Sequence, residues 1–117
     1  MKKIIALLTL TVSITAMADT TNYKCFGTEP FWDFKIKENQ TVFNEMFEDE
    51  TKTETILSRV TAANVGDNTA FVVKTKSTTA TVVAGACSDG MSDETYSHHI
   101  VLENDTSVLY GCCNESL

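Results

Sequence analysis

The chain has 117 residues and a formal net charge of −7 at pH 7, and 43% of its residues are hydrophobic. This length corresponds to one domain with a modest core. A chain of this acidity would be repelled by nucleic acid and by anionic membrane surfaces, which excludes both as partners. A cationic partner would be attracted, and the same charge also keeps an exported protein soluble.

Residues 1–18 have the pattern of a secretory signal peptide. A basic start, Lys2-Lys3, precedes a largely apolar run at residues 4–14, and a small-x-small cleavage site ends at Ala18. The apolar run is too short for a stable membrane span. No cysteine directly follows the cleavage site. We therefore expect a periplasmic or secreted bacterial protein whose single domain covers residues 19–117. Loss of Lys2 and Lys3 with the signal peptide would change its net charge from −7 to −9.

The rest of the chain is rich in threonine and valine, and alternating apolar and polar residues are common, whereas no stretch repeats at helical spacing. Alternation predicts strands at residues 31–37, 40–47, 52–62, 70–76, 79–86, 95–103 and 107–113, with a short first strand at residues 23–26. Residues 64–68 and 104–105 are turn signals. We predict an all-β fold: a small, disulfide-stabilised antiparallel barrel with seven to eight strands in an up-and-down meander.

Because successive side chains on a strand point to opposite faces, the alternation also assigns faces. The expected same-face sets are Trp32, Phe34 and Ile36; Ile56, Ser58 and Val60; Phe71 and Val73; and Tyr96, His98, Ile100 and Leu102.

The mature chain contains four cysteines, Cys25, Cys87, Cys112 and Cys113. An even number in a small exported domain predicts two disulfides. Neighbours on a strand point apart, so Cys112 and Cys113 would find partners on opposite faces. We expect the pairs Cys87–Cys112 and Cys25–Cys113, with a bond between the neighbours Cys112 and Cys113 as the alternative.

The segment CSDGMSDETYSHH at residues 87–99 concentrates polar side chains around one glycine. Asp89, Ser92, Asp93 and Glu94 could offer oxygens to a cation, but the ligand spacing of a calcium loop is absent. The favoured interpretation is a turn, in which Asp89-Gly90 supports a positive φ and Asp93 bonds its own amides. We expect a tight connection between strands that also contributes to recognition.

No motif in the chain predicts catalysis or metal binding. His98 and His99 diverge on a strand and cannot chelate one ion together, so one half-buried and one surface histidine are expected. The sequence has no G-x-S-x-G motif, and disulfide-bonded cysteines cannot act as nucleophiles. We therefore expect no enzyme, no cofactor and no metal.

A second informative stretch is YKCFGTEPFWDFKI at residues 23–36. In the structural interpretation Trp32 plugs one end of the barrel, and Glu29 holds its indole N–H or a backbone amide. In the functional interpretation the two residues form a mouth that grips a ligand or partner. Together with the 87–99 segment, this stretch supplies the candidate binding residues Glu29, Trp32, Asp89, Ser92, Asp93 and Tyr96.

The motifs G-T-E-P-F-W at residues 27–32 and C-S-D-G-M-S-D-x-x-Y at residues 87–96, followed by a late Gly-Cys, resemble a family of small bacterial exported proteins and putative lipoproteins. The resemblance implies an all-β envelope protein in which Cys87 pairs with the Gly-Cys end, and it supplies no catalytic assignment. The lipid-anchor cysteine of some members is missing here, so membrane attachment is not expected.

A weaker likeness is to the periplasmic inhibitors of C-type lysozyme, which are small β-barrels with an early Y-x-C motif. It is based on residues 23–25 and 92–96. We expect an exported, non-catalytic binding protein whose partner is a basic envelope protein or a small ligand. The alternative that this likeness implies is an inhibitor of a basic cell-wall hydrolase, attracted by the acidic charge.

Overall fold

The computed structural model describes residues 21–28, 31–45, 48, 50–91 and 93–116. These residues form antiparallel strands and no helix, so the all-β prediction is confirmed. The strands are β1 (Asn22–Thr28), β2 (Phe31–Ile36), β3 (Gln40–Glu45), β4 (Lys52–Thr55), β5 (Ser58–Thr61), β6 (Ala70–Lys74), β7 (Thr79–Ser88), β8 (Thr95–Glu103) and β9 (Val108–Ser116). Within the described ranges, no helix is long and apolar enough to cross a membrane.

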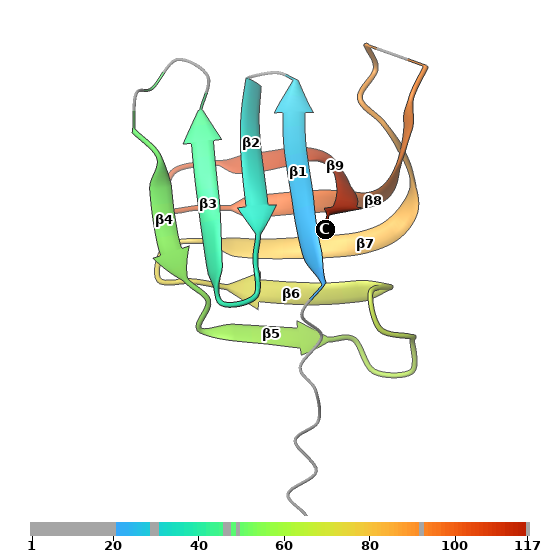
Figure 1. Cartoon of the computed structure of the whole chain (residues 1–117), viewed down its shortest axis with the longest axis horizontal. Coiled ribbons are helices and arrows are strands. Elements are labelled where there is room, and N and C mark those ends of the chain that lie inside the picture. The colour runs from blue at the N-terminus through green and yellow to red at the C-terminus, as the bar shows by residue number, and fades with distance from the viewer. Residues whose placement is uncertain (1–20, 29–30, 46–47, 49, 92, 117) are drawn as a thin grey trace, which may run out of the picture.

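One sheet contains all nine strands in the order β4-β3-β2-β1-β9-β8-β7-β6-β5. Neighbours are sequential except at the centre, where the first and last strands pair, so the predicted meander is confirmed. The sheet curls into a half-barrel, and β1–β4 form one layer that crosses over the layer of β6–β9 (Figure 1).

The two edge strands, β4 and β5, are consecutive in the chain, and the corner between them carries the chain from one layer to the other. The amide of Ile56 donates to the carbonyl of Asn39 at 2.9 Å, whereas the next amide, of Leu57, donates to the carbonyl of Lys74 at 2.8 Å. Successive amides thus bind opposite layers. The single strand predicted at residues 52–62 is therefore divided, which accounts for nine strands instead of seven or eight.

The core lies between the two layers, and most of the expected same-face sets are buried in it. The buried core residues are Tyr23, Cys25, Trp32, Phe34, Ile36, Phe71, Val73, Ala80, Val82, Ile100, Leu102 and Cys113. The set that includes Val60 is wrong, because the corner resets the alternation: Ile56 packs on the core, but Val60 is 62% exposed. Tyr96 also leaves its predicted set, because the pairing of β7 with β8 shifts beside it and its ring packs on Phe26 outside the core cluster.

Buried hydrogen bonds fix the loop between β5 and β6 to the core. His98 is only 4% exposed and His99 is half-buried, so both rings lie deeper than expected. The Nε2 of His98 lies 2.6 Å from the carbonyl oxygen of Asn68, and its Nδ1 lies 2.7 Å from the hydroxyl of Ser97. Because a carbonyl only accepts, Nε2 carries the hydrogen. Tyr23 donates to the Asn68 side chain at 2.8 Å.

Both expected disulfides are present, one on each side of the sheet. Cys25–Cys113 lies in the core and joins β1 to β9. Cys87–Cys112 lies outside the core cluster and joins β7 to β9. The alternative bond between Cys112 and Cys113 is therefore excluded, and all four cysteines are oxidised.

Glu54 links the first layer to the second across the open side of the half-barrel. Its carboxylate accepts hydrogen bonds from the hydroxyls of Ser77 at 2.6 Å and Thr75 at 3.0 Å, both in the turn between β6 and β7. Burial opposes ionisation, but these two hydrogen bonds and the charge of Lys52 outweigh it and hold the pKa of Glu54 below its ordinary value.

The two disulfides are expected to differ in their contribution to stability. Cys25–Cys113 spans 88 positions and Cys87–Cys112 spans 25, so loop entropy predicts contributions of about 4.5 and about 3.5 kcal/mol. Chemical denaturation of the two double Cys→Ala variants measures the difference. If loss of Cys25–Cys113 lowered the free energy of unfolding no more than loss of Cys87–Cys112, the β1–β9 disulfide would not have the dominant role.

The link through Glu54 is expected to make stability depend on acid pH. Since the folded pKa lies below the unfolded one, the ionised carboxylate stabilises the fold above the unfolded pKa, and this contribution is lost as the pH falls through the folded pKa. Thermal unfolding of Glu54→Gln between pH 6 and pH 3 should show a shallower decline than that of the wild type. The control Glu103→Gln, at an exposed carboxyl on β8, should follow the wild type; parallel curves for all three would refute the link.

Candidate functional site

Trp32 lies across two glycines at one end of the central strand pair. Gly27 on β1 and Gly111 on β9 leave room for the indole, because a Cβ atom on Gly27 would overlap its Nε1 and one on Gly111 would lie 2.9 Å from its Cζ2. The ring is 4% exposed, and its centroid lies 6.3 Å from that of Phe43. Trp32 is therefore part of the packed interior, as the structural interpretation expected.

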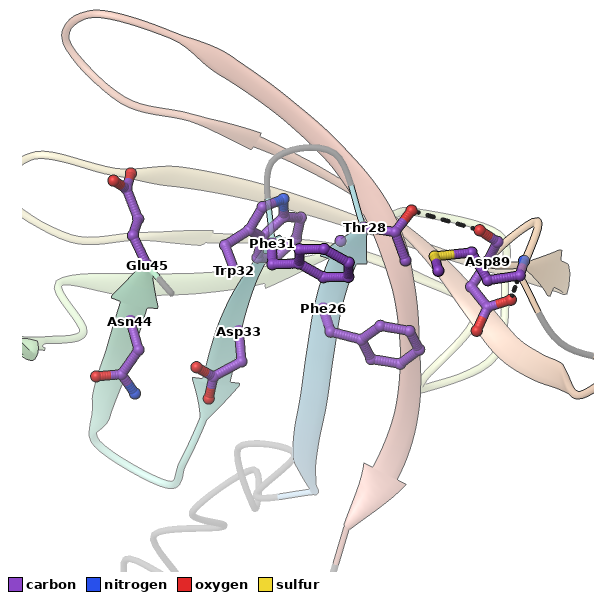
Figure 2. Close-up of a pocket in the computed structure, with 10 residues that line it drawn as sticks. Phe26, Thr28, Phe31, Trp32, Asp33, Asn44, Glu45 and Asp89 are labelled. Atoms are coloured by element: carbon purple, nitrogen blue, oxygen red, sulfur yellow. Dashed lines mark hydrogen bonds between the residues drawn. The ribbon is translucent and has the colours of Figure 1, made fainter. Parts of the chain in front are cut away.

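A cavity of about 450 Å³ opens beside Trp32 at the same end of β1 and β2 (Figure 2). Aromatic and methionine side chains contribute to its wall, and three carboxylates join them. The lining residues are Phe26, Gly27, Thr28, Phe31, Trp32, Asp33, Asn44, Glu45, Asp89 and Met91.

The register of β1, β2 and β3 explains how a large part of this wall is formed. Phe26 on β1 pairs with Asp33 on β2, which in turn pairs with Asn44 on β3, so the three side chains form a row across the outer face. Phe31, at the start of β2, lies on the same face as Asp33 and is 37% exposed. Glu45 is the cross-strand partner of Trp32.

The turn after β7 supplies the opposite wall, and its conformation is the one predicted for the 87–99 segment. Gly90 has a φ of 75°, which is a left-handed conformation. The Asp89 carboxylate accepts from the amide of Met91 at 2.8 Å, so the side chain-to-backbone bond expected of Asp93 is seen at Asp89. Thr28 donates to the Asp89 carbonyl at 3.4 Å, which connects the turn to β1.

A small second cluster on the outer face anchors this turn. The rings of Phe26 and Tyr96 meet edge to face at 4.6 Å. Their cross-strand partners are Cys112 and Cys87, which are buried although they lie outside the core cluster. Tyr96 also donates to Glu94 at 3.0 Å. The base of the turn is thus held by a disulfide and by aromatic packing.

His99 stabilises an irregular stretch of β7 beneath the turn. The pairing of β7 with β8 shifts between Ala84 and Cys87. The Nε2 of His99 donates to the carbonyl of Ala86 at 3.0 Å, and its Nδ1 accepts from the hydroxyl of Tyr110. Both ring nitrogens are used within the fold. Among the described residues, no group of three His, Cys, Asp or Glu side chains could hold a metal ion.

The structure brings some of the candidate binding residues together. Trp32 and Asp89 line the cavity, and the hydroxyl of Tyr96 lies 3.4 Å from the Asp89 carboxylate. Asp93 is exposed and is not among the lining residues that the structure describes. Glu29 and Ser92 lie outside the described residues.

Sequence reasoning missed much of the apolar wall. Phe26 and Phe31 occupy positions whose side chains alternate away from the core, and Met91 lies in a turn with 68% exposure. The available signal was one aromatic residue at an outward strand position just before the 27–32 motif and another within it. A single outward-facing aromatic residue is ordinary on a protein surface, and only a group of them in one place indicates a site.

Comparison with known proteins finds no matching family model, no matching curated protein and no matching solved structure. The resemblance based on the two motifs therefore stays a prediction, and the functional argument depends on the cavity itself.

Substitution of the glycine beneath Trp32 should displace the indole. Gly27→Ala is expected to lower the free energy of unfolding by about 1–3 kcal/mol and to shift the emission of this sole tryptophan to longer wavelength as water reaches it. Gly66→Ala is the matched control, because the nearest atom to its Cβ would lie 3.6 Å away. Unchanged emission in Gly27→Ala would disprove the close packing of ring on backbone.

Proposed function

We propose that this chain is an exported, non-catalytic binding protein whose ligand enters the cavity beside Trp32. The observation that carries the proposal is the cavity itself: about 450 Å³, walled in part by Phe26, Phe31 and Met91. Small-molecule sites in proteins have this size and combine an apolar lining with a few polar groups.

The rigid surroundings of the cavity support a binding role. The floor of the cavity is Trp32, which packs on the backbone of Gly27. The turn after β7, which forms one wall, is bonded to β1 through Thr28 and is anchored at its base by the Cys87–Cys112 disulfide. A preformed site loses little conformational entropy when a ligand binds. The groups with the strongest nucleophilic chemistry are committed to structure, since the cysteines are oxidised and both nitrogens of His99 are bonded.

Export is part of the proposal. Two disulfides are compatible with an extracytoplasmic location. The signal-peptide pattern at residues 1–18 lies outside the described residues, and together with the disulfides it supports the periplasm or the medium as the destination.

A concave apolar site favours a ligand-binding role over inhibition of a basic hydrolase. An inhibitor of that kind uses a projecting loop to enter the cleft of the enzyme. Here Asp89 and Met91, in the acidic turn, form a wall of the cavity instead. The alternative therefore stays second, supported by the net charge of the chain and by the sequence likeness at residues 23–25 and 92–96.

Fragment screening by protein-observed methyl NMR, with neutral, cationic and anionic aromatic and aliphatic fragments, tests the proposal. Hits should shift the methyl resonance of Met91 and should bind at least about tenfold more weakly to Phe31→Ser, because that change removes one apolar wall. Val60→Ser, at an exposed position outside the cavity, should bind like the wild type. If no fragment shifts Met91, or if Phe31→Ser binds every hit unchanged, the cavity is not a binding site.

A further inference from the structure

We infer that the ligand of the cavity is a small organic cation whose charge is surrounded by apolar groups, such as a quaternary ammonium compound. This inference rests on the proposed binding function and adds the chemical class of the ligand. It follows from three features of the lining: its aromatic rings, its carboxylates and its lack of basic side chains.

Three aromatic residues contribute to one end of the site. Phe26, Phe31 and Trp32 come from the adjoining ends of β1 and β2, and Figure 2 shows the ring of Phe31 in front of the indole. The face of an aromatic ring attracts a cation, most strongly where water is excluded. Met91 adds a polarisable, flexible wall that can adapt to methyl groups.

Two lining carboxylates lack partners within the described part of the chain. Asp33 and Glu45 are half-buried, and no described side chain or amide donates a hydrogen bond or forms an ion pair with either carboxylate. No described side chain neutralises either charge, so a bound cation would act as the counter-ion of both. Asp89 adds a third carboxylate, which the amide of Met91 holds in place.

The charged side chains among the described lining residues of the cavity are all negative. No Lys, Arg or His is among its described lining residues. Lys35 and Lys24 share the outer face with Asp33 and Phe26, but they lie two residues farther from the cavity end of each strand. An anionic ligand would meet three carboxylates, whereas a cation would be attracted by them and by the net charge of −7.

The size of the cavity favours a free small molecule over a protein partner. A volume of about 450 Å³ matches sites that enclose a small ligand. A basic protein would instead need a large contact surface around the lysine or arginine that it inserts. The cation is therefore assigned to a small molecule, and a peptide-borne cation is an outcome of the test.

The inference is tested with choline and its neutral isostere 3,3-dimethylbutan-1-ol, which differ only in replacement of nitrogen by carbon. Titrations follow the Met91 methyl resonance of the full exported domain at low and high salt. We expect choline to bind at least about tenfold more tightly than the alcohol, and added salt to weaken choline alone.

Matched charge variants locate the effect. Asp33→Asn should weaken choline binding about tenfold and leave the alcohol unchanged. Glu103→Gln, which removes one exposed charge elsewhere, should change neither affinity by more than about twofold at the higher salt, where distant exposed charges are screened. Asn44→Asp, which adds a carboxylate to the lining, should strengthen choline binding.

Four results would overturn the inference. The first is equal binding of choline and the alcohol at Met91, which would leave a general apolar site and the proposed binding function intact. The second is an equal loss of choline affinity in Glu103→Gln and in Asp33→Asn. The third is tighter binding of a short trimethyllysine peptide than of choline. The fourth is no response to choline; the broader fragment screen then decides separately whether the binding function also fails.

Discussion

The pairing of β1 with β9 is the constraint on which the rest of the structure depends. This junction joins the four strands β1–β4 to the five strands β5–β9 in one sheet, so the chain closes on itself through strands that are nearly 90 residues apart in sequence. The hydrogen-bonded ladder is reinforced by a disulfide between directly opposed residues, Cys25 and Cys113. Contacts of such long range give little benefit until the loop is closed, and the covalent link lowers the entropic cost of closing it.

The candidate site is a direct product of that junction. Gly27 and Gly111 are brought together only when the two strands pair, and only then is there a flat surface for Trp32. On the outer face the same pairing places Phe26 beside Cys112, and hence beside the base of the turn after β7. The β1–β9 pair thus supports the packing of Trp32 on its inner face and part of the cavity wall on its outer face.

Much of the fold could be predicted from local patterns. The alternation in β2 and β6, and in β8 from His98 onward, gave the correct inward faces because each strand has one side on the core. The opposite directions of Cys112 and Cys113 correctly indicated that each has its own partner, on opposite faces of the sheet. The corner at Ile56 and Leu57 could not be predicted, since the two layers that bind these amides are formed by distant segments.

The candidate site was harder to predict, because the local sequence around each of its residues does not indicate the role that the residue has in the folded protein. Nothing in the local sequence indicates that Gly27 makes room for an indole. Phe31 was interpreted only as the start of a strand, and Met91 as part of a polar turn. Their common location depends on the register of β1 with β2 and β9, which no single stretch of sequence encodes.

The pairing of Asn22 with Ser116 places the beginning of β1 and the end of β9 side by side, whereas the cavity lies at the other end of β1, near Thr28. A tether or a fused domain at either terminus would therefore be held several residues' length of strand away from the opening. A protein attached to a surface or carrier in this way would present its cavity outward to the surrounding solution, which makes either terminus suitable for immobilisation without blocking access.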